Sequence, residues 1–239
     1  NNYKKISVCL TTDHFEKYAD QISTVVVVDL LRATSVISVA LECGISSVVP
    51  VRTLEDAKKY KNIDNYIIAA ERDTRIVDGF KYGNSPYHYI DADIKDKNLV
   101  LTTTNGTKAI HLAKEHQVIT ASFVNIDAVV NYLINKDNNV IILCSGWKGL
   151  FNLEDPIFAG ALAEKLLQSG LFSSNCDSMN AAIQLYNNAK IDLFAYLSDS
   201  SYRNRNSSPA IIKDTKFCLK PTLTSNIVPI FCDGKLIRA

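Results

Sequence analysis

The sequence has no long run of one kind of charge and no long apolar segment. Of its 239 residues, 26 are lysine or arginine and 25 are aspartate or glutamate, so the formal net charge is +1. Proteins that bind nucleic acid generally carry clustered basic residues, and this class is therefore disfavoured. No apolar segment approaches the ~20 residues that span a bilayer, and the first residues lack the apolar core of a secretory signal. We expect no nucleic-acid partner, no membrane partner and a cytoplasmic location.

Closely spaced cysteine pairs are also missing. The six cysteines are scattered and none forms a Cys-x-x-Cys pair, which disfavours a disulfide framework and a zinc site. Several of them have apolar neighbours in the sequence. This pattern is typical of buried free thiols in a reducing cytoplasm.

The nucleophile motifs of familiar phosphatases are absent too. No Asp-x-Asp follows a predicted strand, and Leu150 stands six residues after Cys144, where the loop of a cysteine phosphatase needs an arginine. The glycine-rich loops of dinucleotide-binding and P-loop proteins are missing as well, which disfavours an enzyme with a nucleotide-binding fold.

What the chain does contain is an apolar strand that ends in an acid. Four consecutive valines, residues 25–28, have no alternation, as in strands that are covered on both faces of a parallel sheet, and Asp29 follows them. Ligands bind outside the carboxyl ends of such strands, so this carboxylate is well placed to hold a metal or accept a proton. We expect Thr34 and Ser35 to cap the helix that follows, whose first amides would favour an anion.

The predicted elements alternate between strand and helix. Apolar runs predict strands near residues 6–10, 25–28, 47–51, 66–70, 98–104, 118–121 and 139–144. Periodic segments predict helices near residues 36–41, 54–60, 109–113, 128–135, 157–167, 177–190 and 192–198. Asp233-Gly234 between two apolar runs predicts a hairpin over residues 227–237. This pattern predicts an α/β fold with a mostly parallel, mixed sheet and an antiparallel C-terminal hairpin, over residues 1–239 as one domain or as two packed lobes of about residues 1–120 and 121–239.

Polar residues follow several of these strands. If the strands run parallel, these residues emerge at one edge of the sheet and lie close together. Two or three carboxylates without a histidine or cysteine cluster favour a hard cation such as Mg²⁺, and the surrounding donors suit a phosphate ester. The residues concerned are Asp29, Glu71, the turn Thr104-Asn105-Gly106-Thr107, and the segment from Lys148 to Asp155.

Three polar features of the sequence have a structural alternative. Asp29 and Arg32 could form an ion pair beside an ordinary turn, and Asn84-Ser85-Pro86 could serve only to start a helix. Asp155 could be the cap of a helix that begins at Pro156. The residues alone leave these alternatives open.

Five motifs, in this order, resemble the signatures of the 2-phosphosulfolactate phosphatase (ComB) family. The match covers about residues 25–160, whereas the C-terminal third is poorly matched. Ala70 and Asp73 depart from the usual Gly-Glu-Arg-Gly pattern, and Trp147-Lys148 replaces a stretch that often carries arginine. The motifs are Asp29-Leu30-Leu31-Arg32-Ala33-Thr34, Glu71-Arg72, Gly79-Phe80-x-x-Gly83-Asn84-Ser85-Pro86, Thr103-Thr104-Asn105-Gly106-Thr107 and Leu153-Glu154-Asp155-x-x-x-Ala159-Gly160.

The resemblance implies a three-layer α/β/α fold and a Mg²⁺-dependent hydrolase that removes phosphate from 2-phospho-3-sulfolactate. The candidate catalytic residues are Asp29, Glu71, Glu154 and Asp155. Of these, Asp29, Glu71 and one of the two adjacent acids, with Asp155 preferred, are expected to bind the metal. The expected phosphate-binding and anion-binding residues are Arg32, Thr34, Arg72, Asn84, Ser85, Thr104, Asn105, Gly106, Thr107 and Lys148.

The expected partner is therefore a small anionic phosphorylated substrate, and a homodimer is an assembly that the sequence leaves open. A substrate with a second strong anion needs two points of attachment, for which Arg32, Arg72 and Lys148 are the candidate cations. The alternative function is a non-catalytic protein that binds a small phosphorylated or sulfonated metabolite.

Overall fold

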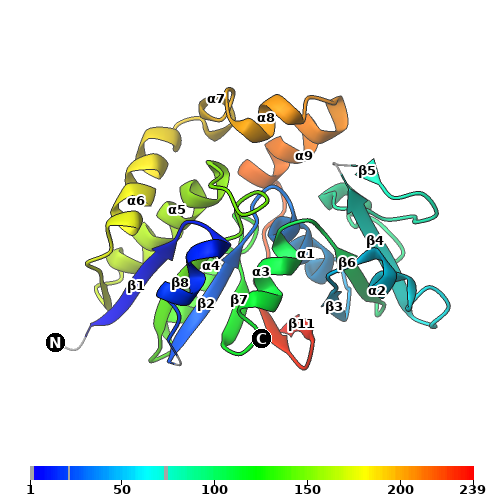
Figure 1. Ribbon diagram of the computed structural model, residues 1–239, viewed down its shortest axis with the longest axis horizontal. Helices are drawn as coiled ribbons and strands as arrows, with labels where there is room; N and C mark the ends of the chain where they lie inside the picture. Colours follow the sequence, from blue (N-terminus) through cyan, green and yellow to red (C-terminus); the bar gives the residue numbers. More distant parts are fainter. Residues whose placement is uncertain (1–2, 21, 73–74) are drawn as a thin grey trace.

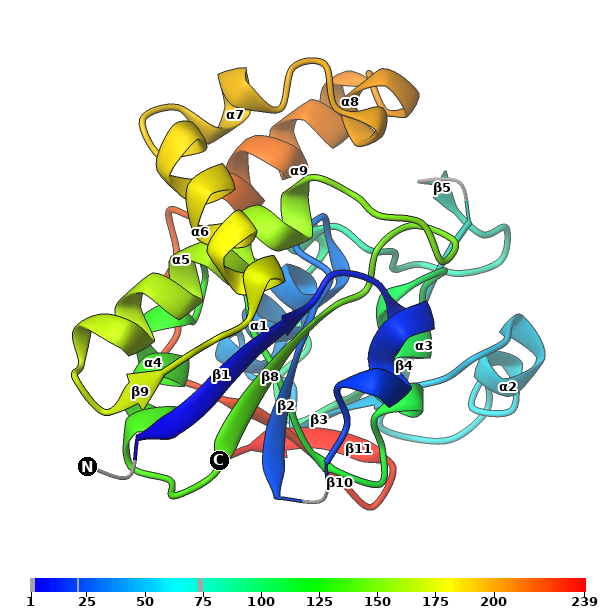
Figure 2. The ribbon, with the colours of Figure 1, turned by 60° about the vertical axis from the view of Figure 1, so that its left-hand side comes forward.

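The computed structural model describes residues 3–20, 22–72 and 75–239. Within these residues, eleven strands form one sheet in the order β5-β4-β6-β3-β11-β10-β7-β2-β8-β1-β9. Helices pack on both faces of this sheet (Figures 1 and 2). The predicted α/β fold, with its mostly parallel mixed sheet and its C-terminal antiparallel hairpin, is confirmed.

Nine of the strands coincide with predicted apolar runs, whereas the two-residue strands β5 and β9 were not predicted. They are β1 (Lys4–Cys9), β2 (Ser23–Val28), β3 (Ser47–Pro50), β4 (Tyr66–Arg72), β5 (Arg75–Ile76), β6 (Asn98–Thr102), β7 (Gln117–Thr120), β8 (Asn139–Cys144), β9 (Phe172–Ser173), β10 (Pro229–Cys232) and β11 (Lys235–Arg238). Every residue of β2 is buried, as expected for a strand covered on both faces.

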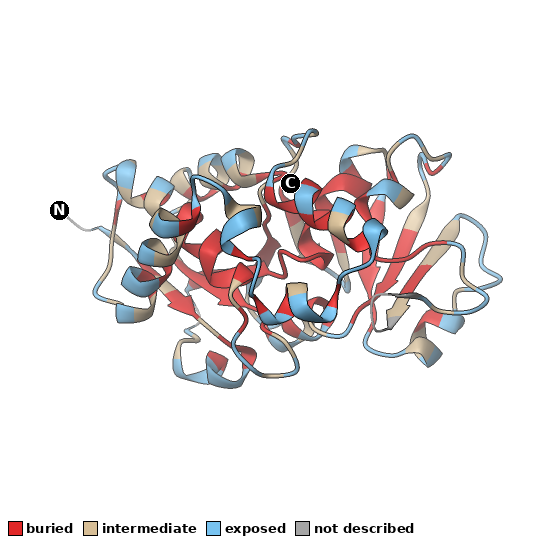
Figure 3. Cartoon of the chain, turned by 90° about the horizontal axis from the view of Figure 1, so that it is seen from above, coloured by how far each residue is buried: buried red, intermediate tan, exposed pale blue. Residues whose placement is uncertain are grey.

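The helices cover the sheet with their apolar sides. They are α1 (Ala33–Glu42), α2 (Leu54–Lys58), α3 (Gly106–Leu112), α4 (Ile126–Ile134), α5 (Glu154–Gln168), α6 (Asp177–Ala189), α7 (Leu193–Tyr196), α8 (Ser201–Arg205) and α9 (Pro209–Leu219), together with the 3₁₀ helices η1 (Thr12–Lys17) and η2 (Pro86–His88). Figure 3 shows the buried residues along the strands and on the inner sides of the helices, with the exposed residues outside. No helix of the described residues is both long and apolar enough to cross a membrane.

The C-terminal hairpin lies in the middle of the sheet. β7, β2, β8, β1 and β9 are parallel to one another, and β3, β6 and β4 form a second parallel group. Three successive pairings between the groups are antiparallel: β7 with β10, β10 with β11, and β11 with β3. Because three reversals leave one net reversal, the pairing alone makes the two groups run in opposite directions. The sequence predicted the hairpin but not its place between the two groups.

Twist brings the carboxyl ends of the two groups back together. From β4 to β2 the sheet has six steps, and a twist of roughly 20–25° per step accumulates to about 120–150°. This rotation nearly reverses the second group, and Figure 1 shows the ends of β2 and β4 directed towards α8 and α9. The polar strand ends therefore converge, although not for the predicted reason that all of the strands are parallel.

Two predicted helix starts are wrong. The Thr34 and Ser35 hydroxyls donate to the carbonyl oxygens of Asp29 (3.0 Å) and Leu30 (2.9 Å), and neither caps α1. Likewise α5 begins at Glu154, before the predicted start at Pro156, so Asp155 lies in the first turn and not at the cap. In both places the polar groups connect the helix to the loop that follows β2.

The six cysteines are free, as expected, and Cys9, Cys144 and Cys218 are buried. Two helices, α8 and α9, were not predicted. They begin at the capping residues Ser200 and Ser208, whose hydroxyls accept from the amides of Arg203 and Ile211. Together with α7 they cover the end of the molecule where the strands converge (Figure 1).

The place of the hairpin can be tested on β11. Leu236 is fully buried and pairs with Val48 in β3, whereas the neighbouring Ile237 is 39% exposed. We predict that Leu236→Ala lowers the free energy of unfolding by about 2–5 kcal/mol, as expected for a cavity in the core. Ile237→Ala, the matched control, should cost about 1 kcal/mol or less. Equal losses in urea denaturation would contradict a central position for β11.

Candidate active site

A cavity of about 200 Å³ lies where the strand ends converge. Asp29 follows β2, Glu71 lies near the end of β4, Thr103 follows β6 and Gly146 follows β8. None of the described lining residues is a histidine or a cysteine. The lining residues are Asp29, Leu31, Glu71, Asn84, Thr103, Thr104, Asn105, Gly146, Trp147, Lys148, Asn152, Glu154, Tyr202, Arg205 and Asn206.

Asp29 is fixed between the starts of two helices. Its Oδ1 accepts from the amide of Ala33 at the start of α1 (3.3 Å). At the start of α3, a Cβ on Gly106 would lie only 2.8 Å from Asp29 Oδ2 and 2.7 Å from the Ala33 Cβ, so glycine is needed for this close approach. Burial raises the pKa of Asp29 to about 6, although the amides of Ala33 and Gly106 and the charge of Arg32 oppose the shift.

The two adjacent acids at the start of α5 have different surroundings. Asp155 Oδ1 accepts from the amide of Leu30 (2.9 Å), and its Oδ2 accepts from the amide of Gly146 (3.1 Å) and from Asn152 Nδ2 (2.9 Å). Both oxygens are thus used to join the loops after β2 and β8. Glu154 lines the cavity, and only its Oε1 accepts a hydrogen bond, from Asn152 Nδ2 (3.1 Å).

Glu154 Oε2 is buried and has no hydrogen-bond partner among the described residues. An orphaned buried acceptor is unfavourable unless a ligand satisfies it. Burial, together with the charge of Asp29, raises the pKa of Glu154 to about 7, although nearby backbone amides and the charge of Arg205 oppose the shift. The pKa of Asp155 is also raised well above its ordinary value, first by burial and then by Asp29 and Glu154.

A buried guanidinium connects the second parallel group to the C-terminal helices. Arg32, which is 3% exposed, donates to Glu71 in β4 and to Asp214 in α9. The Ser85 hydroxyl donates to the other oxygen of Asp214 (2.7 Å). Burial raises the pKa of Glu71 to about 7, with Arg32 opposing the shift and Asp29 adding to it. The alternative of a simple ion pair between Asp29 and Arg32 is wrong, because the guanidinium bonds to other carboxylates.

The turn after β6 forms one wall of the cavity. Thr107 is buried, and its hydroxyl donates to the carbonyl oxygen of Thr103 (3.0 Å), which closes the turn from within. Thr104 is exposed and lines the cavity with Asn105. Asn105 Oδ1 accepts from the backbone amide of Lys148 (2.9 Å), so this turn is joined to the loop after β8.

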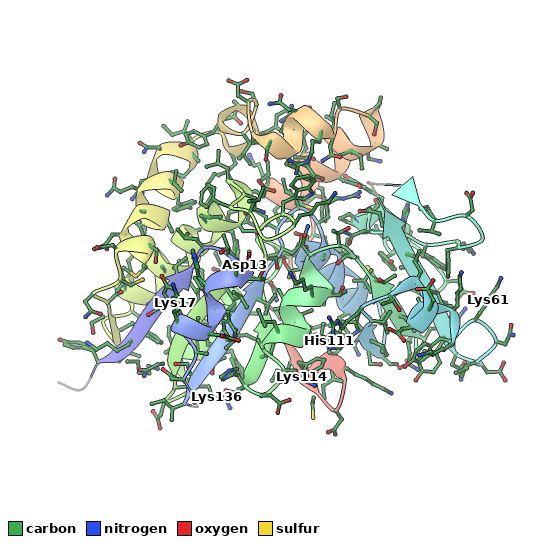
Figure 4. The ribbon with its side chains drawn as sticks, in the orientation of Figure 1. Asp13, Lys17, Lys61, His111, Lys114 and Lys136 are labelled. Carbon is green, nitrogen blue, oxygen red and sulfur yellow. The ribbon has the colours of Figure 1, made fainter. Side chains whose placement is uncertain are left out.

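The loop after β8 carries an aromatic ring with two cations beside it. Lys148 Nζ lies 4.7 Å from the Trp147 ring centroid, and the guanidinium carbon of Arg205 lies 3.8 Å from it. The loop also lies against η1, since a Cβ on Gly149 would lie 2.9 Å from the Asp13 carboxylate, which Figure 4 labels. Arg205 comes from α8, so the C-terminal helices complete the cavity.

Comparison with known proteins agrees with this geometry. A family model described as 2-phosphosulpholactate phosphatase matches residues 9–234. The chain belongs to the 2-phosphosulfolactate phosphatase family. The family expected from the motifs is thereby confirmed, and with it the enzyme class, since phosphatases of this kind hydrolyse phosphoric monoesters.

Three relatives named "Probable 2-phosphosulfolactate phosphatase" illustrate the similarity. The protein of Thermotoga petrophila is 38% identical over 214 residues, which cover 90% of this chain and 91% of the relative. The protein of Clostridium novyi is 34% identical over 237 residues, with coverage of 98% and 100%. The protein of Clostridium beijerinckii is 31% identical over 236 residues, with coverage of 97% and 98%. Membership of the family thus extends over the C-terminal third, where its motifs were hard to recognise.

The structure brings seven of the predicted site residues to the cavity, and the family motifs supply most of them. Those that line it are Asp29, Glu71, Asn84, Thr104, Asn105, Lys148 and Glu154. Arg32, Thr34, Ser85, Gly106, Thr107 and Asp155 are buried beside them, in hydrogen bonds or close packing that support the loops. Arg72 ends β4, and its side chain lies outside what the structure describes. η2 does begin at Pro86, while Asn84 before it lines the cavity.

Several residues of the site were not predicted from the sequence. Asn152 holds both Glu154 and Asp155 through its Nδ2. Tyr202 and Arg205 line the cavity from α8, and Asn206 lines it from the position that follows this helix. Asp214 holds Arg32 from α9. The available signal was the pair Ser208-Pro209, a common helix start, which would have predicted α9 but not its ionic partner.

The buried carboxylates predict how stability depends on pH. Asp29 and Glu154 have ordinary pKa values of 3.8 and 4.5, which the fold raises to about 6 and 7. The folded state therefore binds more protons than the unfolded state between these values, and stability falls as the pH rises from about 4 through 7. We predict that chelator-treated protein is more stable at pH 5 than at pH 7.5.

The double variant Asp29→Asn, Glu154→Gln serves as the comparison for this measurement. It lacks the two titrating groups, so its stability should fall less between pH 5 and pH 7.5 when both proteins are unfolded with urea. The same pH dependence in both proteins would contradict the raised pKa values.

Proposed function

We propose that the protein is a Mg²⁺-dependent phosphatase that hydrolyses the phosphate ester of 2-phospho-3-sulfolactate, or of a closely related phosphorylated acid, to the hydroxy acid and phosphate. One observation carries the proposal: the carboxylates of Asp29 and Glu154 share a small cavity with the donor groups of the turn after β6. The names of the relatives support the same substrate. The free cysteines fit our expectation of a reducing cytoplasm, and a homodimer stays a prediction.

The donor set fits Mg²⁺. The carboxylates are oxygen ligands, and the orphaned Glu154 Oε2 lacks the partner that a cation would supply. Among the described His, Cys, Asp and Glu residues, no group of three or more is arranged to hold a metal ion. This is compatible with Mg²⁺, because the ion is commonly bound by one or two carboxylates together with waters and substrate phosphate.

Asp29 and Glu154 are the residues that would hold the ion. Asp155 was preferred from the sequence, but its oxygens accept from Leu30, Gly146 and Asn152, so we assign it a positioning role. When bound, Mg²⁺ would polarise a phosphoryl oxygen and stabilise the charge that develops during hydrolysis.

The remaining side chains would orient the ester. Thr104 and Asn84 add polar groups to the lining, and these can donate to phosphate oxygens. Glu71 was also predicted to bind the metal, but its Oε2 accepts from Arg32, so we assign it instead the exchange of a proton with the ester oxygen. Its hydrogen bond from Arg32 fixes the orientation of its carboxylate.

Turnover separates this proposal from the alternative of a non-catalytic binding protein. Phosphate release is measured on a panel of phosphorylated hydroxy acids, with Mg²⁺ and after treatment with a chelator. Release that requires Mg²⁺ supports the phosphatase. Saturable binding of the same compounds without release would support the binding protein.

The first prediction of this proposal concerns Asp29. Asp29→Asn keeps the acceptor for the Ala33 amide but loses the charge, so the protein should fold while kcat/KM falls by roughly 100- to 1,000-fold or more. Asp127→Asn, an exposed change on α4, is the control and should have no effect. Calorimetric titration with Mg²⁺ should show weakened binding in the Asp29→Asn protein but not in the control, and unchanged Mg²⁺ affinity would refute the assignment.

A second prediction concerns Cys144, the cysteine at the end of β8. It is fully buried, and burial raises the pKa of its thiol well above the ordinary value, so a thiolate nucleophile is disfavoured. Cys144→Ser should therefore keep most of the turnover. A covalent phosphoryl adduct on the thiol, detected by mass spectrometry, or a loss of several orders of magnitude would overturn this expectation.

A further inference from the structure

Two exposed cations border the cavity at the Trp147 ring. The guanidinium carbon of Arg205 and Lys148 Nζ lie 3.8 Å and 4.7 Å from the ring centroid. In the part of the chain that the structure describes, neither forms an ion pair with a carboxylate. Both charges are therefore available to an anionic ligand.

The other described lining residues do not supply positive charge. Asp29, Glu71 and Glu154 are acids. Arg32 was a sequence candidate for holding a second anion, but it is already paired with Glu71 and Asp214 and is not among the lining residues. Among the described lining residues, the basic side chains are Lys148 and Arg205.

The substrate of the proposed reaction carries a sulfonate in addition to the phosphate and the carboxylate. We propose that Arg205, stacked on Trp147, binds this sulfonate while the phosphate lies at Asp29 and Glu154. The assignment rests on the proposed function and names a residue that determines substrate specificity.

Arg205 suits this role better than Lys148 does. A guanidinium offers several donors in a rigid fork, and stacking on an indole leaves the edge of the fork free for oxygen atoms. Because the ring limits its movement, less conformational entropy is lost when an anion binds. Lys148 adds a point charge on a flexible stem at the same ring.

The geometry separates the two ends of the substrate. The carboxylates of Asp29 and Glu154 come from the loop after β2 and the start of α5, whereas Arg205 comes from α8. Arg205 lines the same cavity of about 200 Å³ as Asp29 and Glu154, so the cation and the acidic end border one small space. A ligand with a phosphate and a sulfonate could thus contact both ends at once.

The neighbouring Arg203 provides a matched control. Its guanidinium carbon lies 3.8 Å from the Phe194 ring, in the same kind of stacking, and it donates to the carbonyl oxygen of Phe194 (3.2 Å). It belongs to the same helix but is not among the residues that line the cavity. Arg203→Ala therefore removes an equivalent stacked arginine without touching the proposed sulfonate site.

The kinetic test compares 2-phospho-3-sulfolactate with 2-phospholactate, which differs by lacking the sulfonate. In the Mg²⁺-loaded enzyme, Arg205→Ala should lower kcat/KM for the sulfonated ester about 10- to 100-fold more than for phospholactate, as expected for loss of a hydrogen bond to a charged group. Arg205→Lys should recover part of the difference, because it restores the charge but not the fork. Arg203→Ala should leave the ratio of the two values unchanged.

A binding test needs no turnover. Trp147 is the sole tryptophan of the chain, so its fluorescence reports on the ring beneath Arg205. Titration of the Mg²⁺-loaded enzyme with 3-sulfolactate should change this emission saturably, and Arg205→Ala should raise Kd about 10- to 100-fold. Calorimetry gives Kd independently of the indole, and lactate should bind the two proteins equally.

The outcomes distinguish the two proposals. Equal losses on both esters together with an unchanged Kd for 3-sulfolactate would overturn the role of Arg205 while leaving the phosphatase intact. If the wild-type protein releases no phosphate but binds 3-sulfolactate in an Arg205-dependent manner, the result supports the sulfonate site and refutes the proposed reaction.

Discussion

The buried guanidinium of Arg32 holds together three parts of the chain that are distant in sequence. Arg32 lies in the loop after β2, and its guanidinium forms ion pairs with Glu71 in β4 and with Asp214 in α9. Removing one partner of a buried ion pair leaves an uncompensated charge, which typically costs about 3–5 kcal/mol. The two parallel groups of the sheet and the helices above them are thereby fixed relative to one another, and the cavity lies among them.

The acids of the cavity lower the stability of the fold when they are ionised. Burial raises the pKa values of Asp29, Glu71 and Glu154, and the charge of Asp29 raises those of Glu71 and Glu154 further. Hydrogen bonds from the loops only partly offset these shifts. Asp155 offsets part of this cost, because it accepts three hydrogen bonds and connects the loops after β2 and β8. Neighbouring acids of the same helix turn therefore have different tasks, one directed to the cavity and one to the scaffold.

Local patterns predicted most of the fold, whereas long-range contacts decided the details of the site. The valines of β2, the acid after them and the Asp233-Gly234 turn were sufficient to predict a buried strand, a candidate ligand and a hairpin. The partner of Arg32 in α9 lies 182 residues away, and no periodicity or spacing encodes such a contact. The division of labour between Glu154 and Asp155 was equally hidden, because it depends on which amides of distant loops point towards each carboxylate.

The central position of the C-terminal hairpin bears on how the chain is made. β10 and β11 are translated after the other strands of the sheet, yet they lie between β7 and β3. Until they emerge from the ribosome, β7 and β3 are open edges with unpaired backbone groups, and such edges are prone to pair with other chains. The twist that brings Asp29 and Glu71 to one cavity also depends on these strands. A nascent chain that ends before them has both parallel groups but lacks the two strands that join these groups within the sheet.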